Sequence, residues 1–281
     1  MYNQYHTHIS SKHNLFDLRL KEVWQYRDLI LLFTKRSFVV QYKQTVLGPT
    51  WFLITPIVSS LIYAFVFGGI ARMSTDGIPQ ILFYLCGNAI WSFFSTSLTK
   101  NAHTFTANAS MFGKVYFPRL TVPISNILSD VIKFGIHSIM LLCFLAYHVW
   151  QGKVHPHWAA WLLIPLVLLH LGVMGMGLGI IISSMTTKYR DLSVLVGFCM
   201  QLWMYATPVI YPLSQVGQGL ARKILMINPA TAPIEIFRYA ILGQGTIDYK
   251  YLTSSWIFTV IVITIGIMVF NKVERTFMDT V

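Results

Sequence analysis

Residues 49–69 read PTWFLITPIVSSLIYAFVFGG, and no charged residue occurs from Gln44 to Ala71. An α-helix rises about 1.5 Å per residue and the hydrocarbon core of a bilayer is about 30 Å thick, so a helix over this stretch is long enough to cross a membrane. The whole chain has the same character. Of its 281 residues, 55% are hydrophobic and 11% are charged, whereas soluble domains carry about 25% charged residues. We therefore expect an integral membrane protein.

The other apolar stretches set the number of crossings. We predict an all-α integral membrane fold with a single transmembrane domain over residues 1–281. Its six transmembrane helices are expected at about residues 49–71, 78–99, 120–148, 159–184, 192–211 and 251–271.

Two further segments are neither ordinary loops nor spans. Residues 1–44 are interpreted as a cytoplasmic tail and an amphipathic interface helix, because apolar side chains alternate there with charged ones such as Asp28. Residues 212–250 are predicted to form an external segment with two re-entrant helices, since its two semi-apolar pieces are too short to cross the bilayer.

The charge distribution predicts the orientation. The chain has 21 Lys and Arg against 10 Asp and Glu, a formal net charge of +11. Residues 100–119 are interpreted as a polar inside loop. With a cytoplasmic N-terminus, fourteen basic residues fall in inside segments, Lys100 of this loop among them, and six, Arg238 among them, fall in outside segments. The positive-inside rule then places both termini in the cytoplasm. Anionic membrane lipids are the expected partners of this excess charge, and no nucleic acid is expected.

The third predicted span carries three polar residues within the apolar sequence. Asp130, Lys133 and His137 follow one another at spacings of three and four residues, so a helix presents them on one face. Such a face is costly in lipid and should therefore look toward protein or water. We favour a structural ion pair near the membrane interface over a transport role for this group.

Motifs for catalysis and nucleotide binding are absent from the sequence. It contains no GxxxxGK[ST] phosphate-binding loop, no HExxH and no GxSxG. His155-Pro-His157 is interpreted as polar loop sequence rather than a metal site. Nothing in these motifs argues for catalysis, and we expect no catalytic residue, no metal and no cofactor on this chain. The glycines at 172, 175, 177 and 179 predict a close approach of a neighbouring helix.

A longer pattern resembles a known family. Residues 26–56 read YRDLILLFTKRSFVVQYKQTVLGPTWFLITP. This run resembles the start of the permease subunit of polysaccharide-exporting ABC transporters, which export O-antigen, capsule or teichoic-acid chains. The matching residues are Arg27, Asp28, Arg36, Tyr42, Lys43, Gln44, Thr45, Leu47, Gly48 and Trp51. Later matches follow in order at Gly87, Asn108 to Pro118, Tyr189 to Asp191, Thr207 to Pro212 and Asn228-Pro229, so the resemblance covers about residues 26–275.

The resemblance implies how the chain works. Such a permease forms a homodimer with two copies of a separate nucleotide-binding ATPase, which holds the ATP and Mg. The implied substrate is a lipid-linked polysaccharide, commonly carried on undecaprenyl pyrophosphate, and the implied location is the bacterial cytoplasmic (inner) membrane. A permease for a drug or a free lipid stays open as an alternative. So does a membrane enzyme acting on polyprenyl lipids, although Asp130 is the one acidic residue within the predicted spans.

Three groups of candidate site residues follow from the resemblance and from physical requirements. ATPase coupling is assigned to Lys188, Tyr189, Arg190, Asp191, Asn108 and Lys114, with an ordinary positive-inside loop as the alternative. Contact with the lipid pyrophosphate is assigned to Arg27, Lys35, Arg36 and Lys43, with general lipid anchoring as the alternative. Contact with the glycan in a channel is assigned to Tyr63, Phe67, Tyr84, Trp91, Trp203 and Tyr205, although most aromatic residues in membrane proteins face lipid or pack between helices.

Overall fold

The computed structural model describes residues 20–43, 45–189 and 191–280, and in this part of the chain every regular element is a helix. The elements are α1 (Leu20–Gln25), α2 (Arg27–Tyr42), η1 (Gly48–Thr50), α3 (Trp51–Tyr63), η2 (Ala64–Ile70), α4 (Gln80–Ala102), α5 (Thr104–Phe112), α6 (Thr121–Trp150), η3 (Trp158–Leu163), α7 (Ile164–Thr186), α8 (Leu192–Tyr205), η4 (Leu213–Gln215), α9 (Leu220–Ile227), α10 (Thr231–Leu242) and α11 (Tyr249–Thr280).

Five helical segments within the described residues are long and apolar enough to cross a membrane. They are Gly48–Ile70, Gln80–Ala102, Thr121–Trp150, Trp158–Thr186 and Tyr249–Val273. These segments coincide with five of the six predicted spans. At the sixth predicted position, 192–211, the structure has α8, an apolar helix of 14 residues. Such a helix is about 21 Å long and falls short of the bilayer thickness, so this crossing stays a prediction.

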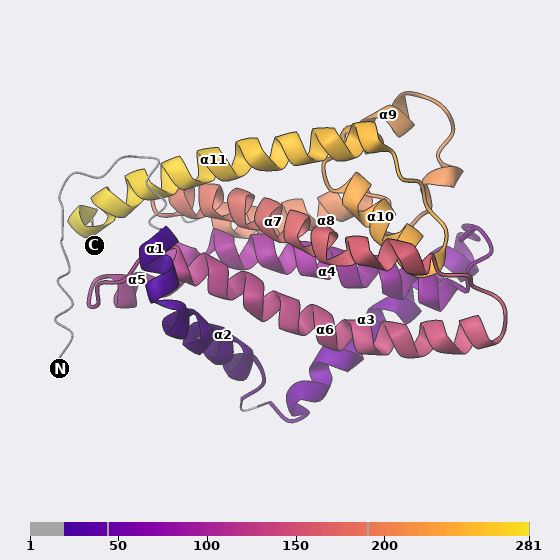
Figure 1. Cartoon of the computed structure of the whole chain (residues 1–281), viewed down its shortest axis with the longest axis horizontal. Coiled ribbons are helices and arrows are strands. Elements are labelled where there is room, and N and C mark those ends of the chain that lie inside the picture. The colour runs from indigo at the N-terminus through magenta and orange to yellow at the C-terminus, as the bar shows by residue number, and fades with distance from the viewer. Residues whose placement is uncertain (1–19, 44, 190, 281) are drawn as a thin grey trace.

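The long helices run side by side along the long axis of the molecule. Figure 1 shows α4, α6, α7 and α11 in this arrangement, with α1, α5 and the C-terminal end of α11 at one end and α9 and α10 toward the other. The first helix of the bundle changes type along its length, because η2 is a π-helix in which Ala71 N–H donates to the carbonyl of Val66 at 2.9 Å. Sequence periodicity does not predict this turn.

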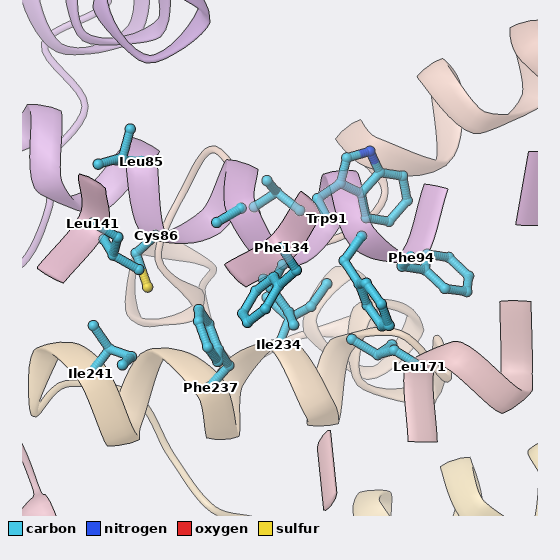
Figure 2. Packing of buried hydrophobic residues seen from close by; sticks show 14 of the residues in the cluster. Leu85, Cys86, Trp91, Phe94, Phe134, Leu141, Leu171, Ile234, Phe237 and Ile241 are labelled. Carbon is cyan, nitrogen blue, oxygen red and sulfur yellow. The ribbon is translucent and has the colours of Figure 1, made fainter. Parts of the chain in front are cut away.

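Helix α4 lies at the centre of the core, in contact with α3, α6, α7, α8 and α10. Figure 2 shows Cys86 and Trp91 of α4 in the same cluster as Phe134 of α6 and Phe237 of α10. The rings of Phe134 and Phe237 meet edge to face with their centroids 5.7 Å apart. The core therefore includes α10, a helix that precedes the last long helix and is too short to cross the bilayer.

The glycines of α7 allow two neighbouring helices to approach its backbone closely, as the sequence predicted. A Cβ at Gly179 would lie 2.5 Å from Asn101 Cβ and 2.7 Å from the carbonyl oxygen of Leu98, both on α4. A Cβ at Gly177 would lie 3.1 Å from the backbone nitrogen of Ile263 on α11. Small residues at helix interfaces are the usual means of packing within membranes, and here they hold α7 between α4 and α11.

Candidate functional site

A cavity of about 510 Å³ lies among α2, α3, α4 and α6. Its lining combines aromatic side chains with polar ones. The lining residues are Gln41, Gly48, Trp51, Phe52, Thr55, Pro56, Ser59, Asn88, Ser92, Phe93, Thr96, Asp130, Lys133, Phe134 and His137. The polar face predicted on the third span is therefore turned toward a cavity, and its three members all line it. Sites that bind small molecules have volumes in this range.

One wall of the cavity is a polar strip on α4. Most of this helix is buried, but Asn88, Ser92 and Thr96 are half-buried and line the cavity. Their spacing of four residues places them on one face of the helix, and Lys100 continues the same series. This strip was not predicted from the sequence, because its residues are spread over three turns of a mostly apolar stretch. The repeated four-residue spacing was the signal that could have revealed it.

Asp130 and Lys133 line the cavity, and Lys100 joins them to form a group of three charges. Asp130 is 1% exposed, and its Oδ1 forms an ion pair with Nζ of Lys100 on α4. Nζ of Lys133 lies 3.7 Å from the same oxygen. The sequence predicted the pair on α6 but assigned Lys100 to an inside loop, so its role is a correction. Spacing along one helix could not reveal it, because the contact joins two helices.

A second buried ion pair lies at the other end of the molecule. Arg238 and Glu235 of α10 are joined at 2.8 Å, and both are buried. The Arg238 guanidinium also donates to the carbonyl oxygens of Pro208 at 2.7 Å and Val209 at 3.2 Å. It stacks over the Phe83 ring of α4 at 4.3 Å. The sequence placed Arg238 in an outside segment and did not predict its ion pair. In the structure the side chain binds α10 to α4 and to the turn after α8.

The turn after α8 is also held by Asn228, which lies between α9 and α10. Its side-chain oxygen accepts a hydrogen bond from Nε1 of Trp203 on α8 at 3.0 Å. Its side-chain nitrogen donates to the carbonyl of Ala206 and the hydroxyl of Thr207 at 2.8 and 2.9 Å. The Asn-Pro pair noted in the sequence therefore fixes the position of the external segment relative to α8.

Comparison with known proteins identifies the family. The sequence profile described as ABC-2 type transporter matches residues 28–242, which is more than half of the chain. This chain belongs to the ABC-2 type transporter family. The resemblance drawn from the sequence is thereby confirmed, and the ABC-2 assignment together with the long apolar helices makes this a multi-pass membrane protein of transport type.

Curated relatives of this ABC-2 chain share most of its length. An O-antigen export system permease protein RfbA of Klebsiella pneumoniae is 27% identical over 253 residues, covering 90% of this chain and 94% of that protein. The protein of the same name from Myxococcus xanthus is 25% identical over 264 residues, covering 93% and 98%.

The coupling residues predicted for this ABC-2 chain lie in two segments at one end of the bundle. Asn108 lies in α5, a helix where the sequence predicted a polar loop, and Lys114 follows it. Lys188, Tyr189 and Asp191 are exposed between α7 and α8, whereas Arg190 lies outside the described residues. The backbone N–H of Phe105 donates to Ser183 Oγ at 3.0 Å, and the hydroxyl of Thr186 donates to the carbonyl of Ala102 at 3.4 Å. The start of α5 is thus held against the end of α7.

The cations predicted to meet a lipid pyrophosphate lie along α2. Arg27, Lys35 and Arg36 are exposed on this helix, and Lys43 is exposed just after it. The opposite side of α2 packs on the bundle, where the Phe33 ring meets Phe117 with the centroids 5.7 Å apart. The lining of the polar cavity does not include these four residues.

The six aromatic residues predicted to contact glycan have different environments. Tyr84 and Trp91 are 1% and 5% exposed, and Tyr84 packs against Phe83 and Tyr63. A side chain buried among the helices of its own chain lines no channel, so the structure corrects these two to packing residues. The other four lie on α3, η2 and α8, where Tyr63, Phe67 and Trp203 are half-buried and Tyr205 is exposed.

Proposed function

We propose that this chain is the membrane subunit of an ATP-driven exporter that moves a lipid-linked polysaccharide across the bacterial cytoplasmic membrane. The substrate class is an O-antigen-like glycan on undecaprenyl pyrophosphate. The observation that carries this proposal is similarity over at least nine-tenths of the chain to permeases named for O-antigen export. No comparable relationship supports a drug permease or an enzyme acting on polyprenyl lipids.

The proposed topology has six crossings with both termini in the cytoplasm. Helices α1 and α5 and the C-terminal end of α11 lie at one end of the bundle in Figure 1. This arrangement supports an even number of crossings, and we propose α8 with the turn that follows it as the sixth. In this topology α2 lies in the inner membrane interface, and α9 and α10 are external re-entrant helices.

A homodimer is proposed from the exposure of two apolar helices. In the most apolar 18-residue stretch of Gly48–Ile70, only 11% of the residues are buried within the chain. On α8 the buried residues are Val196, Met200 and Met204. The hydroxyl of Tyr63 contacts Met204 Sδ at 3.8 Å, so α3 and α8 lie close together. A second copy facing these helices would enclose a channel that Tyr63, Phe67, Trp203 and Tyr205 approach, where aromatic faces offer weak, repeated contacts to sugar rings.

The driving energy is proposed to come from a separate ATPase, with two copies per dimer, which carries the ATP and Mg while this chain carries no cofactor. Its contact surface comprises α5 and the turn between α7 and α8. Because the hydrogen bonds of Phe105 and Thr186 join these two segments, a movement of the ATPase at either one reaches both α4 and α7.

The experiment that tests the function is deletion of the gene from its bacterium, followed by measurement of surface glycan by gel and immunoblot. We expect surface glycan to disappear, lipid-linked glycan to accumulate on the cytoplasmic side, and the wild-type gene to restore export. Normal surface glycan in the deletion strain would refute the proposal.

A matched pair of variants tests the interface helix. Arg36→Ala removes an exposed cation of α2 and should reduce export while membrane insertion and dimer formation are retained. Lys153→Ala removes an exposed cation of the α6–α7 loop and should export like the wild type. Equal export by the two variants would exclude an essential role for Arg36.

A further inference from the structure

The polar cavity among α2, α3, α4 and α6 has an unbalanced charge. Two ammonium groups, those of Lys100 and Lys133, share the single carboxylate of Asp130. Among the described residues that line the cavity, Asp130 is the one acidic side chain. Counted as formal charges, the group therefore carries one excess positive charge, and of its two ammonium groups that of Lys133 is the more buried, with a side chain 9% exposed against 27% for Lys100. A charge in this position is costly without a partner.

The donors and acceptors of this group are only partly used. Asp130 is 1% exposed. Within the described part of the chain, its Oδ2 has no hydrogen-bond partner. Nζ of Lys133 lies 3.7 Å from Oδ1 of Asp130 and 5.9 Å from the centre of the Phe52 ring. His137 lines the cavity one turn further along α6. The site thus offers cationic donors beside one unsatisfied carboxylate oxygen.

The walls complete a site for a ligand that is both anionic and hydroxylated. Asn88, Ser92 and Thr96 of α4 present an amide and two hydroxyl groups, which pair with polar substituents. Trp51 and Phe52 of α3 supply apolar ring surface on another side of the cavity. Phosphates are the abundant anions of membrane lipids, and ammonium and imidazolium groups bind them by charge-assisted hydrogen bonds.

We propose that this cavity binds the phosphate-bearing headgroup of a membrane lipid, with the Lys133 ammonium donating to the phosphate oxygens and Asp130 Oδ2 accepting a hydrogen bond from a hydroxyl group of the headgroup. The site is distinct from the exposed cations of α2. Its link to glycan export rests on the proposed function, under which the headgroup belongs to the polyprenyl carrier. The phosphate could equally belong to a glycerophospholipid, and the test separates these sources.

The test measures lipid binding to the purified full-length chain by native mass spectrometry and by displacement of a labelled lipid. The probes are undecaprenyl phosphate, phosphatidylglycerol and inorganic pyrophosphate. Lys133→Met removes one charge and leaves Asp130 paired with Lys100, so the fold is expected to survive. The matched control is Lys153→Met, in the exposed α6–α7 loop.

We expect Lys133→Met to weaken binding of undecaprenyl phosphate at least tenfold, while Lys153→Met binds like the wild type. An equal loss for phosphatidylglycerol would assign the site to lipid phosphates in general, and a loss confined to undecaprenyl phosphate would assign it to the carrier. Binding of pyrophosphate alone, or unchanged lipid binding by a folded Lys133→Met chain, would overturn the proposal.

A second variant tests the cavity without changing its charge. Ser92→Leu places an apolar side chain in the half-buried strip of α4 and should weaken binding of the same lipid by blocking the space. Unchanged binding by a folded Ser92→Leu chain would also count against the site. Failure of either binding test leaves the export proposal standing, because that proposal is decided by surface glycan in the deletion strain.

Discussion

The first two apolar segments, Gly48–Ile70 and Gln80–Ala102, have the same length of 23 residues and opposite surroundings. The first has the higher mean hydropathy. Yet only 11% of the residues in its most apolar 18-residue stretch are buried in the chain, against 72% for the second. In a soluble protein the order would be reversed. In a bilayer, lipid tails are as apolar as leucine, so apolarity alone does not draw a helix into the bundle. Burial here follows small and polar residues.

Particular residues of α4 carry this difference. Its Ser97 and Asn101 are fully buried and lie beside the glycines of α7. Gly87 allows the turn after α8 to approach, since a Cβ there would lie 2.5 Å from the carbonyl oxygen of Val209. Exposed positions of α3 and η2, by contrast, carry large apolar side chains such as Leu61 and Phe65. Four substitutions test the comparison, in decreasing order of expected effect.

The largest effect is expected for Gly179→Val, which breaks the contact between α7 and α4. The new side chain would collide with Asn101 and with the Leu98 carbonyl, and overpacking of this severity destabilises by about 3 kcal/mol or more. We expect little folded protein by size-exclusion chromatography in detergent. Gly135→Val is the control, because no atom of the described residues lies within 4 Å of a Cβ at that position. Equal yields of the two variants would contradict the packing described.

The next effect is expected for Asp130→Ala, which leaves two cations without a carboxylate. Removal of one member of a buried ion pair costs roughly 3–5 kcal/mol. Because the Lys100 side chain is 27% exposed, we expect a loss near the lower end of that range. The measurement is the free energy of unfolding in micelles of increasing SDS content. Asp191→Ala, at an exposed acid between α7 and α8, should have no comparable effect.

A smaller effect is expected for Ile90→Ala in the middle of α4. This side chain is 0% exposed, and its truncation leaves a cavity whose cost is about 2 kcal/mol at the lower end of the usual range. Unfolding in SDS again provides the measurement. A change below the error of that measurement would mean that α4 is less tightly packed than its burial indicates.

The smallest effect is expected for Val58→Ala on α3, where the side chain is 47% exposed within the chain. Substitutions at such positions change stability by no more than about 0.5 kcal/mol. The same unfolding assay, run on the monomer at low protein concentration, measures it. A loss as large as that of Ile90→Ala would show that α3 is held by contacts within its own chain, and the contrast between the two helices would fail.

The sequence predicted the features that arise along a single helix. Length and apolarity located the five long segments, the three-and-four spacing located Asp130 with Lys133, and the glycines of α7 indicated close packing. Features that depend on two helices were missed or misassigned. Lys100 was taken as a loop charge, and the ion pair of Arg238 with Glu235 was not predicted, because a charged residue near the end of an apolar stretch has the same sequence signature whether it is solvated or paired.

The channel residues show the same limit. Aromatic side chains on a predicted span face lipid, a partner or the core, and composition does not distinguish these three directions. Tyr84 and Trp91 are buried because α4 packs against α3 and α8, whereas Tyr205 is exposed, and only the packing of the helices reveals this difference. The residues assigned to ATPase coupling and to the interface are exposed in the structure where described, except for the half-buried Asn108, and their roles stay predictions.

The Arg238 guanidinium has a mechanical consequence for the external end. One side chain holds the carbonyls after α8, the carboxylate of Glu235 and the Phe83 ring of α4 at the same time. These three parts cannot separate without exposing a charge, so they are expected to move as one rigid unit. Under the proposed export function, a polymer leaving the membrane would travel alongside this unit, and any widening of its route would come from tilting the whole unit against a neighbouring molecule.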